Sequence, residues 1–141
     1  MTALFGRILL AAIFILSGCA KLFDYEGTYA HMQAAGIPYT GLLLVIAACV
    51  EILGGLSVAT GTYARLGALA LIGFLIPTTV VFHHFWTLDG PEKIGQMANF
   101  MKNVAIAGGL MQVVAYGAGR IAVDNKLRHQ GTLGVFAHPR M

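Results

Sequence analysis

The sequence predicts an all-α integral membrane protein, an antiparallel bundle of four transmembrane helices with both termini in the cytoplasm. Its residues are 57% hydrophobic and only 11% charged, whereas a soluble domain carries about 25% charged residues. So few polar groups cannot cover a water-soluble core. Length is the second observation, because 141 residues hold four spans of about 20 residues with short loops and little else.

Four apolar segments define the expected spans, at residues 4–23, 39–60, 64–86 and 98–118. A polar loop that ends in Gly36-Ile37-Pro38 separates the first two, and the third contains an uncharged run over residues 66–82. Residues 1–123 are therefore expected to form one four-helix transmembrane domain. Residues 124–141 are expected to form a short polar cytoplasmic tail.

Basic residues flank the apolar segments unevenly, which predicts the orientation. With the amino terminus inside, the cytoplasmic side carries Arg7, Arg65, Arg120, Lys126, Arg128 and Arg140, and the other side carries Lys21, Lys93 and Lys102. This excess favours both termini inside. The net charge of +3 thus reads as a topology signal, so the expected partner is the lipid bilayer and not nucleic acid.

The first apolar segment has a competing interpretation. Arg7, an apolar run and then Leu16-Ser17-Gly18-Cys19 resemble a bacterial lipoprotein signal that is cleaved and lipidated at Cys19. Cleavage would leave three spans and would remove the helix that carries Lys21. We therefore favour the uncleaved chain, and the intact mass distinguishes the two.

Each apolar segment carries its own ionisable residue: Lys21, Glu51, His83 beside His84, and Lys102. A charged side chain at the bilayer centre costs roughly 2.5–3.5 kcal/mol on insertion scales, so such residues are usually functional. At 1.5 Å per residue, Lys21, His83 and Lys102 lie near the outer helix ends and Glu51 lies roughly 18 Å from the outer face. The spacing predicts a shared site that opens outward, with Glu51 as its floor.

Neighbouring residues extend this site, and each member also has a purely structural interpretation. Ser17 is one helical turn from Lys21 and shares its face, while Asn103 follows Lys102. Both lysines are long enough to extend their ammonium groups to the lipid headgroups, and the histidines suit an interface. Glu51 is harder to dismiss, because at that depth a carboxylate must be paired with a lysine, hydrogen-bonded or protonated.

The cysteines and histidines do not form a recognisable metal or redox motif. Cys19 and Cys49 are not spaced as CxxC, and their depths differ by roughly 9 Å along the membrane normal. A disulfide is therefore not expected, and neither is a metal site.

An ordered set of polar, glycine and proline residues extends over about residues 7–124. It consists of Arg7, Ser17-Gly18, Lys21, Gly36, Pro38, Glu51, Gly54-Gly55, Gly61, Arg65, His83, Lys102-Asn103, Gly108-Gly109-Leu110, Gly117, Gly119 and Asp124. This ordered set resembles the DoxX family of small four-span membrane proteins. The resemblance implies a four-helix bundle in a bacterial plasma (inner) membrane. It also implies a link to quinone-coupled sulfur oxidation or to thiol and oxidative stress.

The polar cluster and the resemblance lead to one hypothesis, a membrane subunit of a redox, thiol-stress or sulfur-oxidation system with quinone as the candidate cofactor. Glu51 and His83 would exchange protons. The substrate-binding residues would be Ser17, Lys21, Lys102 and Asn103. A separate redox protein is the expected partner, and a homodimer is considered. A small proton or solute transporter and a non-catalytic scaffold remain alternatives, so the sequence leaves open whether the chain is an enzyme.

Overall fold

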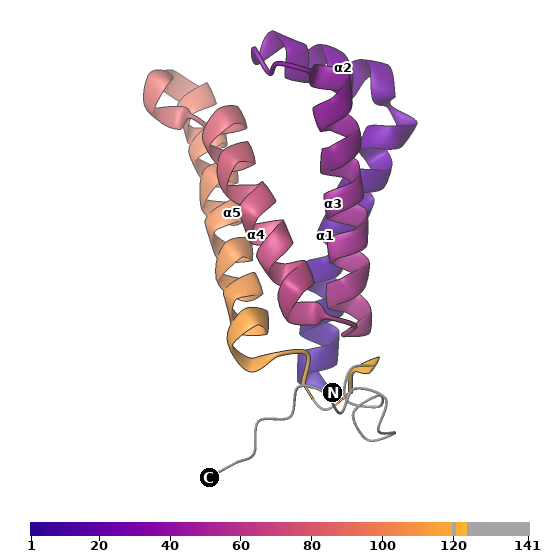
Figure 1. Cartoon of the computed structure of the whole chain (residues 1–141). Helices are drawn as coiled ribbons and strands as arrows, with labels where there is room; N and C mark the ends of the chain where they lie inside the picture. The colour runs from indigo at the N-terminus through magenta and orange to yellow at the C-terminus, as the bar shows by residue number, and fades with distance from the viewer. Residues whose placement is uncertain (120, 124–141) are drawn as a thin grey trace.

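The structure is a computed structural model that describes residues 1–119 and 121–123; the expected tail, residues 124–141, lies outside the described residues. All regular structure in the described part is helical. The elements are α1 (Thr2–Phe23), α2 (Tyr25–Ala34), α3 (Thr40–Thr60), α4 (Ala64–Phe82), the 3-10 turn η1 (Phe85–Thr87) and α5 (Gly90–Tyr116). Four of these helices are long and run antiparallel, while the short α2 lies across one end of the bundle (Figure 1).

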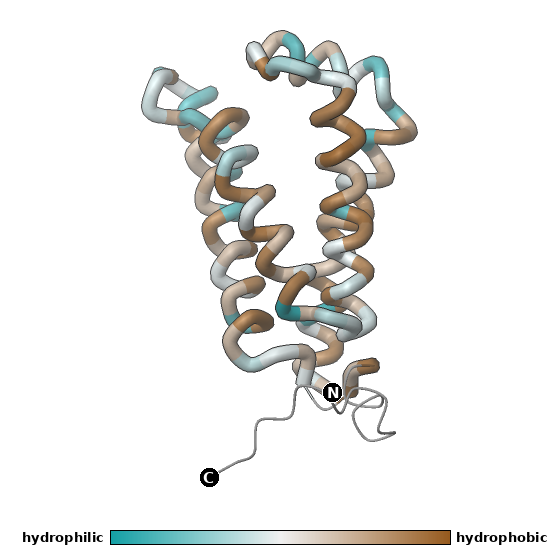
Figure 2. Tube along the Cα trace, in the orientation of Figure 1, coloured by the Kyte–Doolittle hydropathy of each residue, from teal (hydrophilic) through white to brown (hydrophobic). Residues whose placement is uncertain are grey.

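The two ends of the bundle differ. At the α2 end, α1 and α4 finish and α3 and α5 begin, whereas the N-terminus and the end of α5 lie together at the opposite end (Figure 1). Hydrophobic residues run along the long helices, and hydrophilic residues are frequent at the α2 end (Figure 2). This arrangement follows the polarity of a membrane and its aqueous boundary.

Three segments of the described chain are long and apolar enough to cross a membrane: Thr2–Phe23, Thr40–Thr60 and Ala64–Thr87. Large apolar side chains on these helices are exposed, including Phe5, Leu53 and Leu66. In water such a surface would drive aggregation, but it suits contact with lipid. The chain is therefore an all-helical integral membrane protein.

The first three expected spans agree with the segments Thr2–Phe23, Thr40–Thr60 and Ala64–Thr87 to within two residues at each end. Within the third segment α4 ends at Phe82, so His83 and His84 lie in the connection to η1 and not in the helix. The fourth helix begins at Gly90, eight residues earlier than expected. Its first turns are polar, with Asp89 at the N-cap and Pro91 in the first turn, so a search for apolar runs misses them.

The expected polar loop between the first two spans contains a helix, α2. The Asp24 side chain accepts a hydrogen bond from the backbone N–H of Gly27 at 3.2 Å, which is the usual N-cap interaction. Asp24 is also the residue that ends α1, so α1 turns into α2 within a single residue. This places α2 directly across the end of the bundle.

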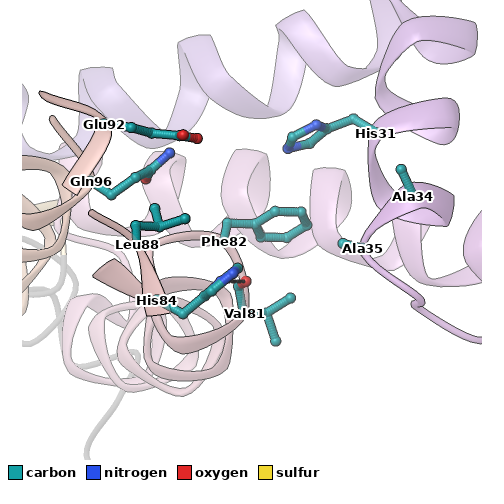
Figure 3. A pocket seen from close by; sticks show the side chains of 9 residues that line it. All are labelled: His31, Ala34, Ala35, Val81, Phe82, His84, Leu88, Glu92 and Gln96. Carbon is teal, nitrogen blue, oxygen red and sulfur yellow. Dashed lines mark hydrogen bonds between the residues drawn. The ribbon is translucent and has the colours of Figure 1, made fainter. Parts of the chain in front are cut away.

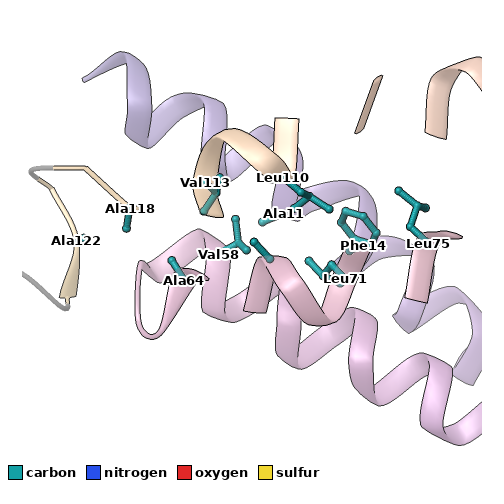
Figure 4. Packing of buried hydrophobic residues seen from close by; sticks show 11 residues of the cluster. Ala11, Phe14, Val58, Ala64, Leu71, Leu75, Leu110, Val113, Ala118 and Ala122 are labelled. Carbon is teal, nitrogen blue, oxygen red and sulfur yellow. The ribbon is translucent and has the colours of Figure 1, made fainter. Parts of the chain in front are cut away.

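The helices pack in the order α1, α3, α4, α5, and α1 touches α5 only slightly. Side chains from all four long helices meet in one core, in which Val58, Leu71 and Leu110 are fully buried and Phe14 nearly so (Figure 4). The bundle is therefore held by a chain of neighbouring helix pairs and a shared apolar centre.

Glycine brings α3 and α4 into close contact. A Cβ atom added at Gly67 would lie 2.4 Å from Ser57 Oγ and 3.1 Å from the carbonyl oxygen of Gly54. Real Cβ atoms essentially never come within 3.0 Å of another atom, as the one at Gly67 would with Ser57 Oγ, so a side chain at this position would force the helices apart. Small residues at such crossings let membrane helices pack backbone to backbone.

Replacing Gly67 with alanine should therefore destabilise the fold by about 1–3 kcal/mol, the usual range for overpacking. Gly108→Ala is the matched control, because a Cβ at Gly108 would meet nothing within 4 Å. That variant should unfold at or slightly above the wild-type midpoint, since alanine favours the helix. Unfolding midpoints in one detergent measure both, and equal midpoints for the two variants would contradict this packing.

Candidate functional site

Lys21, Ser17 and Glu51 form one polar network between α1 and α3. The Lys21 Nζ atom lies 2.7 Å from Glu51 Oε2 and donates a hydrogen bond to Ser17 Oγ at 2.8 Å. Ser17 Oγ in turn donates to Glu51 Oε1 at 2.9 Å. Both carboxylate oxygens therefore have a partner, and the charges of the lysine and the glutamate compensate each other.

Two local features of the sequence build this network. Ser17 and Lys21 are four residues apart on α1, so both side chains point to the same face. Gly18 lies between them, where an added Cβ would be 3.0 Å from the Ala48 carbonyl oxygen and 3.1 Å from Glu51 Cβ. The missing side chain at Gly18 lets α3 approach until the carboxylate reaches the α1 pair.

Burial differs sharply between the two charged groups. The Glu51 side chain is 5% exposed and the Lys21 side chain is 21% exposed. An ammonium group carries three N–H donors, and in the described part of the chain only Ser17 and Glu51 receive them. The network thus places a partly accessible ammonium group next to a buried carboxylate, and one N–H of that ammonium group has no acceptor among the described residues.

A second set of polar contacts joins α4 to α5. Asn103 Nδ2 donates to Thr79 Oγ1 at 3.0 Å, and Thr79 Oγ1 donates to the Leu75 carbonyl oxygen at 2.6 Å. Closer to the α2 end, His83 Nδ1 lies 2.8 Å from Gln96 Oε1. No hydrogen bond among the described residues connects this set to Glu51. The expected site is therefore divided between the α1–α3 and α4–α5 pairs.

Lys102 lies apart from both groups. Its side chain is exposed and reaches Asn99 Oδ1 at 3.4 Å. Neighbouring residues on a helix point about 100° apart, and Asn103 already faces α4. Lys102 consequently points away from the interior of the bundle, whereas sequence spacing alone suggested that the two would act together.

The cysteines are not joined to each other: Cys19 is partly exposed, Cys49 is exposed, and both thiols are free. Within the described residues no group of three His, Cys, Asp or Glu side chains could hold a metal ion.

Arg7 has a role that the sequence analysis did not predict. Its side chain is buried, and its guanidinium donates to the carbonyl oxygens of Ala118, of Ile121 at 2.8 Å and of Ala59 at 3.4 Å. Arg7 thus ties the end of α3 to the segment after α5. The location of Arg7 inside an apolar run is the sequence signal that could have indicated a buried role.

Fold and site together define a helical membrane protein with a buried ion pair between two of its crossing helices. The chain belongs to the DoxX family, whose sequence profile matches residues 2–84. It is 32% identical to the inner membrane protein YphA of Escherichia coli (strain K12) over 87% of this chain and 88% of the relative. It is 34% identical to the inner membrane protein YqjF of the same strain over 88% of this chain and 90% of that relative.

The family match covers α1 to α4 and stops at His84, while the alignments with the two relatives extend over most of the chain. No solved structure matches the chain. With two inner membrane relatives and several apolar helices, the protein is a bacterial inner membrane protein.

Proposed function

We propose that the protein is the membrane subunit of a redox or thiol-stress system and that a quinone headgroup binds at the Lys21–Ser17–Glu51 network. The observation that carries this proposal is the contrast in burial, with a 21% exposed ammonium over a 5% exposed carboxylate. The exposed side of the ammonium group is where a ligand could reach this network, whereas an ion pair buried on all sides could not bind one.

The donor set at this network suits a quinone. Quinone carbonyl oxygens accept hydrogen bonds, and Lys21 has an N–H that no described residue accepts. Reduction of a quinone takes up two electrons and two protons. In this proposal a partner redox protein supplies the two electrons, and the two protons come from water by way of Glu51 and His83. Between transfers Glu51 is ionised and balances the charge of Lys21, which orients the carbonyl oxygen.

The α4–α5 residues have secondary roles in this proposal. Asn103 and His83 already make hydrogen bonds to Thr79 and Gln96, so they would shape the opposite side of the headgroup site, with His83 exchanging protons near the α2 end. Lys102, on the outside of α5, would attract anionic sulfur substrates or lipid headgroups. Protons would then move between Glu51 and His83 through the ligand or through water.

We also propose that α5 is a fourth span and that both termini are cytoplasmic. Its 27 residues extend about 40 Å at 1.5 Å per residue, more than the roughly 30 Å hydrocarbon core. It packs along α4, itself part of an apolar span. The slight contact between α1 and α5 leaves a flank where a redox partner or a second copy would pack.

The binding experiment is a titration of the purified protein in nanodiscs with a soluble quinone and, separately, its quinol. Saturable binding is expected in at least one redox state, and Glu51→Gln should weaken it about tenfold by removing the charge behind Lys21. Lys102→Gln is the matched control and should bind like the wild type. Failure to saturate in both redox states would remove quinone from the proposal.

A proton pathway is the second candidate, and the hydrogen-bond chain favours it. Lys21, Ser17 and Glu51 form a continuous donor–acceptor series, which is what a proton relay in a membrane requires. Proteoliposomes with an internal pH dye would then show a leak that Glu51→Gln abolishes. Pure scaffolding is the third candidate, in which the ion pair serves stability alone and a folded variant without both charges keeps its function.

A further inference from the structure

A pocket at the α2 end shares no residue with the Lys21–Ser17–Glu51 network. Its volume is about 280 Å³, and it lies between α2 on one side and the α4–η1–α5 connection on the other. Figure 3 shows His31 of α2 facing Glu92 and Gln96 of α5 across the pocket, with Phe82 of α4 between them. Ala34, Ala35, Val81 and Leu88 complete its apolar walls.

Flat rings form one side of the pocket. The imidazole of His31 stacks on the ring of Phe82, with centroids 5.1 Å apart and planes 19° apart, and both residues line the pocket. The stacked pair connects α2 to α4, and it presents planar surface to whatever enters. Stacking on such a surface contributes about 0.5–1.5 kcal/mol beyond simple burial, and it selects planar ligands.

The polar groups around the pocket are the side chains of His31, His84, Glu92 and Gln96, and Glu92 is the acidic one among them. His84 Nδ1 lies 2.8 Å from the Val81 carbonyl oxygen, which can only accept, so Nδ1 carries a proton. When the ring carries that proton alone, Nε2 is an acceptor. Glu92 adds a carboxylate in the first turn of α5, where the helix dipole stabilises its negative charge. Within the described part of the chain Glu92 has no ion-pair partner.

Gln96 is held with its amide oxygen toward His83 Nδ1 at 2.8 Å. The pocket therefore combines a flat ring surface with the carboxylate of Glu92, which has no ion-pair partner among the described residues. An anion would be repelled by Glu92. A metal ion would lack ligands, because the described residues provide no group of three His, Cys, Asp or Glu side chains.

From this combination we infer that the pocket binds a planar aromatic cation: its ring would stack beside Phe82, and its charged or N–H group would face Glu92 and His84. Proflavine, a flat fluorescent cation with two amino groups, is a suitable probe. The full chain in nanodiscs of zwitterionic lipid should bind it saturably. Tetrapropylammonium, which is not planar, and naphthalenesulfonate, which is an anion, should not displace it.

Matched variants test the assignment. Glu92→Gln should weaken proflavine binding about five- to tenfold, as expected for loss of one charge-assisted contact at a partly exposed site, and Phe82→Leu should weaken it similarly. Asp89→Asn removes a nearby charge that lies outside the pocket and makes no capping hydrogen bond, so it should stay within twofold of wild type.

Glu51→Gln should also leave proflavine binding unchanged, which separates this inference from the quinone proposal. Two results would overturn the inference: uptake that rises linearly without saturation, as for partition into lipid, or saturable binding that Glu92→Gln leaves at the wild-type affinity.

Discussion

Replacing Lys21 with methionine should destabilise the protein by about 3 kcal/mol, because it leaves the Glu51 carboxylate without its counter-charge in an apolar interior. The Glu51 side chain is only 5% exposed, so water cannot take the place of the ammonium group. Ser17 would still donate one hydrogen bond to the carboxylate, which limits the loss. The unfolding midpoint in detergent at neutral pH measures the effect.

The reverse substitution should be milder. In Glu51→Gln the unpaired Lys21 is already 21% exposed and sits near the end of α1, so it can extend toward the aqueous boundary. We expect a loss of about 1 kcal/mol for this variant. The double variant should recover most of the stability lost in Lys21→Met, because no buried charge remains. Equal stability of Lys21→Met and wild type would contradict a buried ion pair.

Replacing Arg7 with leucine should destabilise the protein by about 3 kcal/mol or more, for a different reason. The substitution removes the guanidinium from the carbonyl oxygens of Ala118, Ile121 and Ala59. A buried carbonyl without a donor costs about 1–3 kcal/mol. The segment after α5 should therefore detach from α3. Limited chymotrypsin digestion should then cleave the bond that follows Tyr116 faster in the variant than in the wild type.

Gly61 shows how closely this contact is built. It ends α3 with a positive φ of 76°, which glycine adopts without strain, and an added Cβ would lie 2.7 Å from both Arg7 Nη1 and Ala122 Cβ.

Arg65→Leu is the matched control for Arg7→Leu. Arg65 is exposed and donates to the Ala115 carbonyl oxygen at 3.4 Å, so its loss should cost under about 1 kcal/mol. A similar loss in both variants would show that burial of Arg7 is not the cause.

Composition and spacing predicted the parts of the site that lie within one helix or follow from solvation. The four-residue spacing of Ser17 and Lys21 predicted their shared face, and the structure confirms it. The depth of Glu51 required a partner, which proved to be Lys21. Choosing between Lys21 and Lys102 was beyond the sequence, because that choice depends on how α5 is rotated against α4.

Features set by polar end regions were missed for physical reasons. Tyr25–Ala34 has neither a long apolar run nor clear amphipathic periodicity, so its sequence predicts a loop, although Asp24 is a usable N-cap signal. His83 looked like a helical residue because the apolar run continues past it to Trp86, yet the helix ends at Phe82. The walls of the pocket are α2 and the connection after α4, the two features that the sequence did not predict, so the pocket could not be predicted either. The assignment of the cytoplasmic side stays a prediction.

The most direct test of a functional ion pair uses the Lys21→Met/Glu51→Gln double variant, which should keep the fold while removing both charges. Its unfolding midpoint and its quinone and quinol affinities are measured in the same nanodiscs as the wild type. A functional site predicts a midpoint close to wild type together with loss of saturable binding. Quinone affinity equal to wild type in a folded double variant would contradict it and would leave the ion pair as a structural element of the α1–α3 contact.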